Sequence, residues 1–275
     1  MLACTGVNNP DKPSTKNGAL SGEFTINSSA KKVHFSQGNL QYNASKDTWR
    51  FAENQYDIVG SDNSNINSPT YEGWIDLFGW GTGNSPMLCS TSDDVYTAFV
   101  DWGVNKISNG GNNVNYWRTL TRDEWVYIFH NRPYAEYLFG LGKVDSISGI
   151  ILLPDNWKTP ESLTFLTSKD QNLEWIDHRE SGIDLSYYNS TTYNDVNVYS
   201  IAEWIRMENA GAVFLPAAGY RYASVVDAIG SNGVYWSSSP RSSTDAFNII
   251  FNSHQVWPQL CYNRRYGLAV RLVHE

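Results

Sequence analysis

Few residues in this sequence have types and spacings that are typical of a catalytic or metal-binding site. The three cysteines, Cys4, Cys89 and Cys261, lie far apart and form no Cys-x-x-Cys motif. That spacing excludes a disulfide framework and a cysteine-built zinc site as organising features. Neither a Gly-x-Ser-x-Gly nor a His-Glu-x-x-His motif occurs. We therefore predict no catalytic residues, no bound metal and no cofactor.

Two weaker patterns could still indicate an enzyme. The sequence Gly140-Leu-Gly142 lacks the third glycine and the preceding strand of a dinucleotide-binding loop. The acidic pair Asp93-Asp94, with many aromatic residues nearby, could belong to a glycosidase. A glycosidase depends on the separation of two carboxylates, which a sequence does not give, and acidic loops are usually just solvated. Neither pattern carries a prediction of catalysis.

Composition narrows the class of protein further. The chain has 275 residues and a mass of 31.0 kDa, with 17% charged, 41% hydrophobic and 14% aromatic residues. This aromatic content can fill a core, so the chain is not globally disordered. The net charge of -8 argues against a nucleic-acid partner. No apolar run reaches the roughly 18 residues of a membrane-spanning helix, so no transmembrane segment is expected.

The N-terminus differs in composition from the rest of the chain. Residues 1–19 are rich in Asn, Pro, Lys and Ser, and we interpret them as a flexible leader before one domain at 20–275. The small residue before Cys4 resembles the tail of a bacterial lipobox, in which Cys4 would carry a lipid anchor; the alternative is that Cys4 is accidental. The polar, weakly charged composition is typical of a protein at the cell surface or on a phage virion.

The elements of the domain follow from periodicity and caps, and they predict an α+β fold. Short strands are expected at 23–26, 32–35, 39–42, 49–51, 150–154, 212–216 and 267–273. Helices are expected at 121–131 and 200–210, because Thr121 with Glu124 and Ser200 with Glu203 are capping boxes before apolar stripes. The aromatic loop 73–81 should be buried, and 106–115 should be an exposed turn.

Four segments together resemble a known fold family. They are residues 117–125 (Trp-Arg-Thr-Leu-Thr-Arg-Asp-Glu-Trp), 213–221 (Val-Phe-Leu-Pro-Ala-Ala-Gly-Tyr-Arg), Tyr235-Trp-Ser237 and 267–273. They resemble the C-type-lectin-like fold of the formylglycine-generating-enzyme type and, more narrowly, the variable proteins of diversity-generating retroelements and their Bacteroides-type relatives. The resemblance implies two capped helices packed on small antiparallel sheets, an elaborated N-terminal β region, and a variable region at about 235–273. In that family, error-prone copying at adenines diversifies a ligand-binding surface.

The resemblance and the local pattern define a candidate binding surface. Residues 241–245 have neither strand nor helix period, and a run of that kind varies without cost only where it is exposed. Tyr, Ser, Arg, Asn and Trp are also the usual chemistry of adaptable binding surfaces. The predicted binding residues, which should share one solvent-facing patch, are Arg241, Ser242, Ser243, Thr244, Asp245, Asn248, Ile250, His254, Gln255, Trp257, Leu260, Tyr262 and Arg265. Arg264, by contrast, should be structural.

Three functions remain open on this reading. The first is a non-catalytic, adhesin-type protein that binds a protein or glycan on a cell surface through a diversified surface. The second is an oxidoreductase of the formylglycine-generating type, which would need a cysteine pair; Cys89 and Cys261 do not match its positions. The third is a carbohydrate-binding adhesin of fixed specificity. The patterned C-terminal region favours the first. The calcium-dependent sugar motifs Glu-Pro-Asn and Trp-Asn-Asp are absent.

Overall fold

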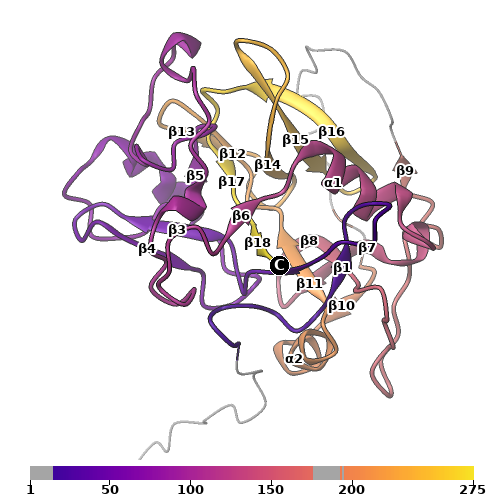
Figure 1. The fold of residues 1–275 in the computed structure, drawn as a ribbon. Coiled ribbons are helices and arrows are strands. Elements are labelled where there is room, and N and C mark those ends of the chain that lie inside the picture. The colour runs from indigo at the N-terminus through magenta and orange to yellow at the C-terminus, as the bar shows by residue number, and fades with distance from the viewer. Residues whose placement is uncertain (1–14, 176–192, 194) are drawn as a thin grey trace, which may run out of the picture.

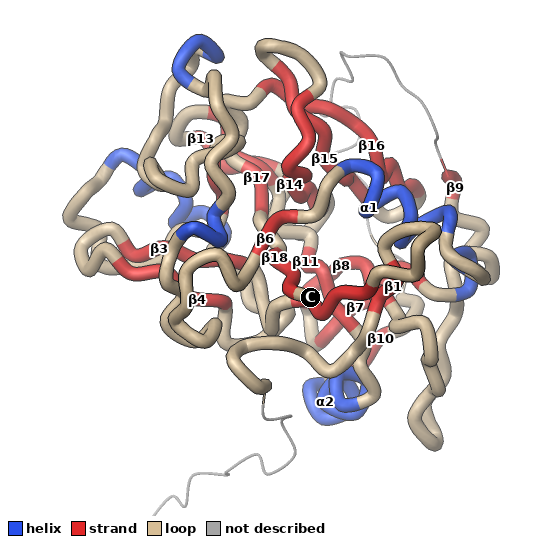
Figure 2. Tube along the Cα trace, in the orientation of Figure 1, coloured by secondary structure: helices blue, strands red, loops and turns tan. Residues whose placement is uncertain are grey.

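The computed structural model describes residues 15–175, 193 and 195–275, and it has the mixed α+β architecture expected from the sequence (Figure 1). The predicted leader, residues 1–19, lies mostly outside the described residues, and so does Cys4. Short strands occupy the centre of the molecule, and long loops surround them (Figure 2). No helix among the described residues is long and apolar enough to cross a membrane.

A six-stranded sheet carries most of the predicted binding region. Its order is β5 (Leu77–Phe78), β17 (Leu268–Ala269), β14 (Gly233–Pro240), β15 (Asp245–Phe251), β16 (Gln255–Asn263) and β9 (Glu174–Trp175). The pairs β14–β15 and β15–β16 are antiparallel hairpins, whereas β14–β17 and β16–β9 are parallel. This sheet is therefore mixed rather than purely antiparallel.

Two four-stranded sheets and two hairpins complete the β structure. One sheet has the order β1 (Phe24–Thr25), β2 (Lys32–Phe35), β18 (Leu272–His274) and β6 (Arg118–Thr119). The other has the order β10 (Val198–Tyr199), β7 (Phe139–Val144), β8 (Ile147–Leu152) and β11 (Val213–Pro216). The hairpins are β3 (Leu40–Asn43) with β4 (Thr48–Phe51), and β12 (Tyr220–Tyr222) with β13 (Val225–Asp227).

The strand predicted at 267–273 is in fact two strands in two sheets. Strand β17 pairs with β14, and strand β18 pairs with β2 and β6. Between them, Arg271 is 1% exposed and donates to the side-chain oxygens of Gln55 (2.8 Å) and Asn39 (3.4 Å). A buried guanidinium needs acceptors for its donors, and two of its nitrogens find them on side chains of the N-terminal region. The chain consequently crosses from one sheet to the other at this point.

Both predicted capping boxes are present. Thr121 and Glu124 cap α1 (Arg122–Val126), and Ser200 and Glu203 cap α2 (Ile201–Asn209). Helix α1 is shorter than expected because the chain continues as a π-helical turn from Tyr127 to Asn131. Helix α2 buries Trp204 and Met207 against strands of the β10–β7–β8–β11 sheet.

The predicted core residues are confirmed. Trp125, Trp204, Trp236 and Val270 are each at most 1% exposed, and each such side chain contributes on the order of 1.5–3 kcal/mol by its burial. The aromatic loop also turns inward, with Leu77, Phe78 and Trp80 buried. In the segment 106–115, residues 112–115 are exposed but Ile107 is buried, so only its second half is the expected turn.

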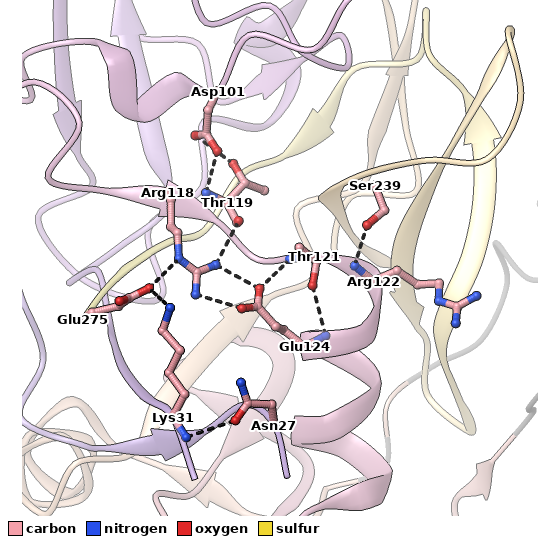
Figure 3. A network of polar contacts seen from close by, with 10 residues as sticks. All are labelled: Asn27, Lys31, Asp101, Arg118, Thr119, Thr121, Arg122, Glu124, Ser239 and Glu275. Carbon is pink, nitrogen blue, oxygen red and sulfur yellow. Dashed lines mark hydrogen bonds and ion pairs between the residues drawn. The ribbon is translucent and has the colours of Figure 1, made fainter. Parts of the chain in front are cut away.

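A network of ion pairs and hydrogen bonds fixes the start of α1 (Figure 3). Arg118 donates to both carboxylate oxygens of Glu124 at 2.8 Å and pairs with Glu275, which also pairs with Lys31. The main-chain N–H of Arg122 donates to the hydroxyl of Ser239 at 3.0 Å. The Ser239 contact attaches the C-terminal end of β14, next to the tip of the β14–β15 hairpin, to the start of α1.

Candidate binding surface

The tip of the β14–β15 hairpin is exposed and closed by its own hydrogen bonds. The N–H groups of Arg241 and Ser242 both donate to the carbonyl of Asp245, at 3.0 and 3.1 Å. The Ser242 hydroxyl accepts from the N–H groups of Thr244 (3.2 Å) and Asp245 (2.9 Å). Residues 241–244 are exposed, as predicted, and Asp245 is half-buried. The loop conformation therefore depends on Ser242 and Asp245 and not on the side chains of Arg241 and Ser243.

Arg264 supports the hairpin tip from the buried side of the loop. Its side chain is buried and donates to the carbonyls of Ser242 and Tyr96, while its guanidinium lies 4.2 Å from the ring centroid of Trp80. Its main-chain N–H donates to the carbonyl of Thr244 at 2.8 Å. Desolvation by burial lowers the pKa of Arg264. The prediction that Arg264 is structural is confirmed.

Beside the hairpin lies a group of four tyrosines, Tyr220, Tyr222, Tyr262 and Tyr266, which we call the tyrosine cluster. The ring of Tyr266 lies 5.4 Å from Tyr262, 5.2 Å from Tyr222 and 6.0 Å from Tyr220, measured between centroids. Aromatic pairs at these distances are in favourable contact. Tyr222 is 38% exposed, so the cluster is continuous from the core to the surface.

Arg265 joins the tyrosine cluster to the 3-10 helix Asp93–Val95. Its guanidinium pairs with Asp93 at 2.6 Å and lies 5.7 Å from the ring centroid of Tyr222. The side chain of Arg265 is 26% exposed. Arg265 was predicted to face outward. Its side chain is instead half-buried, and Asp93 neutralises its charge. The acidic pair considered for a glycosidase thus supplies an ion-pair partner.

Five of the predicted binding residues, Asn248, Ile250, Trp257, Leu260 and Tyr262, lie on one face of the sheet, the last three on strand β16 and not in the connecting loop expected there. Asn248 is opposite Leu260, and Ile250 is opposite Trp257, in the β15–β16 register. The two steps along β15 from Asn248 to Ile250 therefore correspond to three steps along β16. The extra residue in β16 is a β-bulge. This extra residue keeps Trp257 and Leu260 on the same side, where Tyr262 also packs.

The prediction that these residues face solvent is wrong for four of them. Asn248, Ile250, Trp257 and Leu260 are between 0 and 3% exposed. The N-terminal β region covers this face, since Ile250, Trp257 and Leu260 share one core cluster with Trp80 and Phe78. The polar residues around Trp257 suggested that it is exposed, but Gln255 and Gln259 are themselves only half-buried while Trp257 is covered by the N-terminal β region.

Two further residues lie away from the patch. His254 is exposed in the turn between β15 and β16, and Gln255 begins β16, opposite Glu174 of β9. The N–H groups of both donate to the side-chain oxygen of Asn252, at 2.9 and 3.0 Å. The seven residues of β15 separate this turn from Asp245, a distance of about 20 Å. The expected single patch thus does not include His254 and Gln255.

Asn248 is the least satisfied polar side chain on the buried face. It is 0% exposed, and neither its Oδ1 nor its Nδ2 has a hydrogen-bond partner in the described part of the chain. Its neighbours in the register are Trp236 and Leu260. The nearby Tyr262 hydroxyl is also buried without a described partner, and burial raises the pKa of Tyr262. An unpaired buried amide costs about 1–3 kcal/mol, so packing alone does not explain this residue.

The two inner cysteines lie on different sides of the sheet. Cys261 is opposite Phe247 and so faces away from Asn248 and Leu260, whereas Cys89 packs on the cluster that contains Leu260. Both are free thiols, and Cys89 Sγ lies 3.2 Å from a guanidinium nitrogen of Arg221. Burial raises the pKa of the Cys261 thiol, which favours its protonated, less reactive form. Among the described residues, no group of three or more His, Cys, Asp or Glu side chains could hold a metal ion.

Tyr222, Tyr266 and Asp93 belong to the surface but were not among the predicted binding residues. In the strand Tyr220–Tyr222 the first two residues are buried and only Tyr222 is exposed, so no alternation marks it in the sequence. No local signal places Asp93 beside Arg265, since 172 residues separate them.

Comparison with known proteins gives one match. A family described as a domain of unknown function (DUF8237) matches residues 174–273, the segment from β9 to β18 that includes the hairpin and the tyrosine cluster. Neither the curated proteins nor the solved structures include a match to this chain.

Proposed function

We propose that this chain is a non-catalytic ligand-binding protein of the C-type-lectin-like type, similar to the variable proteins of diversity-generating retroelements. Its binding surface comprises the exposed hairpin tip, 241–244, and the exposed edge of the tyrosine cluster. The ligand is a protein or glycan on a cell surface, and the protein itself is carried on a cell surface or a phage virion. A lipid on Cys4 is the proposed means of attachment to a cell.

One observation carries this proposal: the hairpin tip is shaped by the Ser242 hydroxyl, Asp245 and the buried Arg264, and the side chains of Arg241 and Ser243 take no part in those hydrogen bonds. Both of these side chains are exposed. A surface can change its side chains without refolding only when its backbone is held in this way.

The chemistry of the surface suits macromolecular ligands. Tyrosine and arginine supply rigid contact area at low entropic cost, and serine and threonine supply adaptable hydrogen bonds. The tyrosine rings pack against one another and leave no deep pocket between them. A ligand would meet the exposed edge of the cluster. A broad ligand surface fits this shape better than an enclosed small molecule.

The buried face adds a second line of support. Asn248 is a polar residue at a position surrounded by Trp236, Leu260 and Ile250, and no described group pairs with it. A residue selected for packing would be apolar there. In the family that this chain resembles, copying errors at adenines introduce residues without regard to packing, and Asn248 fits that origin.

Sequencing the gene and its flanks in many isolates tests the proposal. We expect a near-identical repeat of the segment for residues 235–273, a reverse-transcriptase gene beside it, and differences between copies at adenines of the repeat. A single invariant copy with no repeat would contradict the retroelement origin and would leave an adhesin of fixed specificity as the function. A distinct result, copper bound at Cys89 or Cys261, would reopen the oxidoreductase.

A further inference from the structure

A second candidate site lies at the other end of β16 from the tyrosine cluster. A groove of about 660 Å³ is bounded by the π-helical turn, the 3-10 helix Ala135–Tyr137 and the loop 168–173. Val256, near the start of β16, reaches its floor, whereas Tyr262 lies six residues further along the strand. About 20 Å of strand therefore separates the two sites. The groove has the volume of a small-molecule site.

The floor of the groove is apolar and preformed. Phe129, Phe139 and Val256 line it and are each at most 4% exposed. The rings of Phe129 and Phe139 meet edge to face with centroids 5.1 Å apart. A floor packed in this way holds its shape whether or not a ligand is present, so a ligand would not have to order it.

Two tyrosines at the rim are exposed in a manner that folding does not explain. Tyr134 is 78% exposed and Tyr137 is 42% exposed. Tyr134 also has φ 60° and ψ 24°, a left-handed conformation that costs a bulky residue roughly 1–2 kcal/mol. Glycine or asparagine would adopt this backbone more readily. The exposed ring recovers none of that cost by burial, and this outlier points to a role in binding.

Three charged side chains that line the groove, Arg132, Glu136 and Lys169, are each held in an ion pair. Lys169 pairs with Glu136 at 3.0 Å and donates to the Tyr137 hydroxyl at 2.7 Å. Arg132 is 2% exposed, pairs with Asp155 at 3.2 Å and donates to the carbonyl of Leu153 at 2.9 Å. A charged ligand would have to break one of these pairs. The arrangement therefore favours a ligand without net charge.

From these features we propose that the groove binds a neutral saccharide unit of a glycan. The C–H face of a sugar ring packs on an aromatic ring, and Tyr134 and Tyr137 offer such rings at the rim. Hydroxyl groups of the sugar would exchange hydrogen bonds with Asn172, which is exposed at the edge of the groove, and with the tyrosine hydroxyls. This site does not depend on the hairpin or on the tyrosine cluster.

Titration of the full chain with trisaccharides tests this site. The neutral probes are maltotriose, cellotriose, xylotriose and tri-N-acetylchitotriose, and the charged probe is trigalacturonic acid; calorimetry and saturation-transfer NMR detect binding. We expect at least one neutral probe to bind and Tyr134→Gly to weaken it about twofold to tenfold, the range of aromatic contacts. Tyr134→Phe keeps the ring and should bind like the wild type.

The controls separate this site from the other one. Tyr134→Gly relieves a strained backbone, so its melting temperature should not fall, and a loss of binding then reports on the ring. Tyr222→Ala alters the tyrosine cluster and should leave saccharide binding unchanged. Binding that is lost in Tyr222→Ala and kept in Tyr134→Gly would overturn the inference, as would binding of the charged probe alone or of no probe at millimolar concentration.

Discussion

The guanidinium of Arg264 donates to the main-chain carbonyl of Ser242, and this contact connects the buried end of the β16–β17 turn to the exposed tip of the β14–β15 hairpin. The same guanidinium reaches the carbonyl of Tyr96 at 3.0 Å. One buried side chain therefore positions the hairpin and the loop that carries Asp93. The candidate surface is rigid because of this arginine.

Replacing that arginine should destabilise the protein. Arg264→Ala leaves several buried carbonyls without a donor, and each lost charged hydrogen bond contributes about 1.5–3 kcal/mol. We expect the free energy of unfolding to fall by about 2–4 kcal/mol in urea denaturation. Arg122→Ala is the matched control, since its ion pair with Asp123 is exposed, with 38% and 81% of the two side chains accessible, and contributes about 1 kcal/mol or less. Equal losses in the two variants would contradict the role given to Arg264.

The hairpin tip should tolerate changes that leave Ser242 intact. The triple variant Arg241→Ala, Ser243→Ala, Thr244→Ala alters exposed side chains, and each should change stability by no more than about 0.5 kcal/mol. Ser242→Ala removes the hydroxyl that accepts from the N–H groups of Thr244 and Asp245, and should cost about 1 kcal/mol on its own. Thermal unfolding followed by circular dichroism compares them. A triple variant that loses clearly more than about 1.5 kcal/mol, the most that three such changes allow, would show that the displayed side chains also hold the loop.

Asn248 should be replaceable by an apolar residue of similar size. Asn248→Leu removes an unpaired buried amide, so we expect the free energy of unfolding to stay the same or to rise by about 1–2 kcal/mol. Asn39→Leu is the contrasting variant, because the amide of Asn39 contacts Tyr235 at 3.2 Å and Arg271 at 3.4 Å. That variant should lose stability. A large loss from Asn248→Leu instead would mean that Asn248 has a partner of its own.

The buried carboxyl of Asp76 should make stability depend on pH. Burial raises the pKa of Asp76 to about 6, against about 3.9 for an unfolded aspartate. The folded state thus binds the proton more tightly, and the stabilisation by the protonated form is complete below about pH 4. As the pH rises through about 6 this stabilisation is lost, and the free energy of unfolding falls by up to about 3 kcal/mol. Denaturation between pH 4 and 7 should show this slope, and Asp76→Asn should abolish it. A slope that persists in Asp76→Asn would assign it to another group.

Local signals in the sequence predicted the helices and much of the core. A capping box lies within four residues, so Thr121 with Glu124 and Ser200 with Glu203 are readable without the fold. Trp125 and Trp204 follow those caps at core spacing and are buried. The alternation that places Asn248 and Ile250 on one face is local too, and it was read correctly.

What covers each face is decided by distant parts of the chain. Trp257 was expected outside because its neighbours are polar, yet it packs in the cluster that contains Trp80 and Phe78. The β-bulge in β16 places Leu260 and Trp257 on the same face, and Pro258 within the strand is a local sign of it, but nothing local shows which part of the chain covers that face. The division of 267–273 between two sheets depends on Gln55, which accepts from Arg271 across 216 residues. Contacts of this length have no signature in a single sequence.

Selection from a displayed library tests the central claim most directly. Randomising positions 241, 243, 244 and 222 changes exposed side chains of the proposed surface, and a matched library at the exposed positions 28, 29, 113 and 114 is the control. Both libraries are selected against hen egg-white lysozyme as a neutral test ligand. The proposed function predicts folded lysozyme binders from the first library, with melting temperatures close to that of the parent, and none from the control. Binders from both libraries at equal frequency, or unfolded clones throughout the first, would contradict a surface built to vary its ligand.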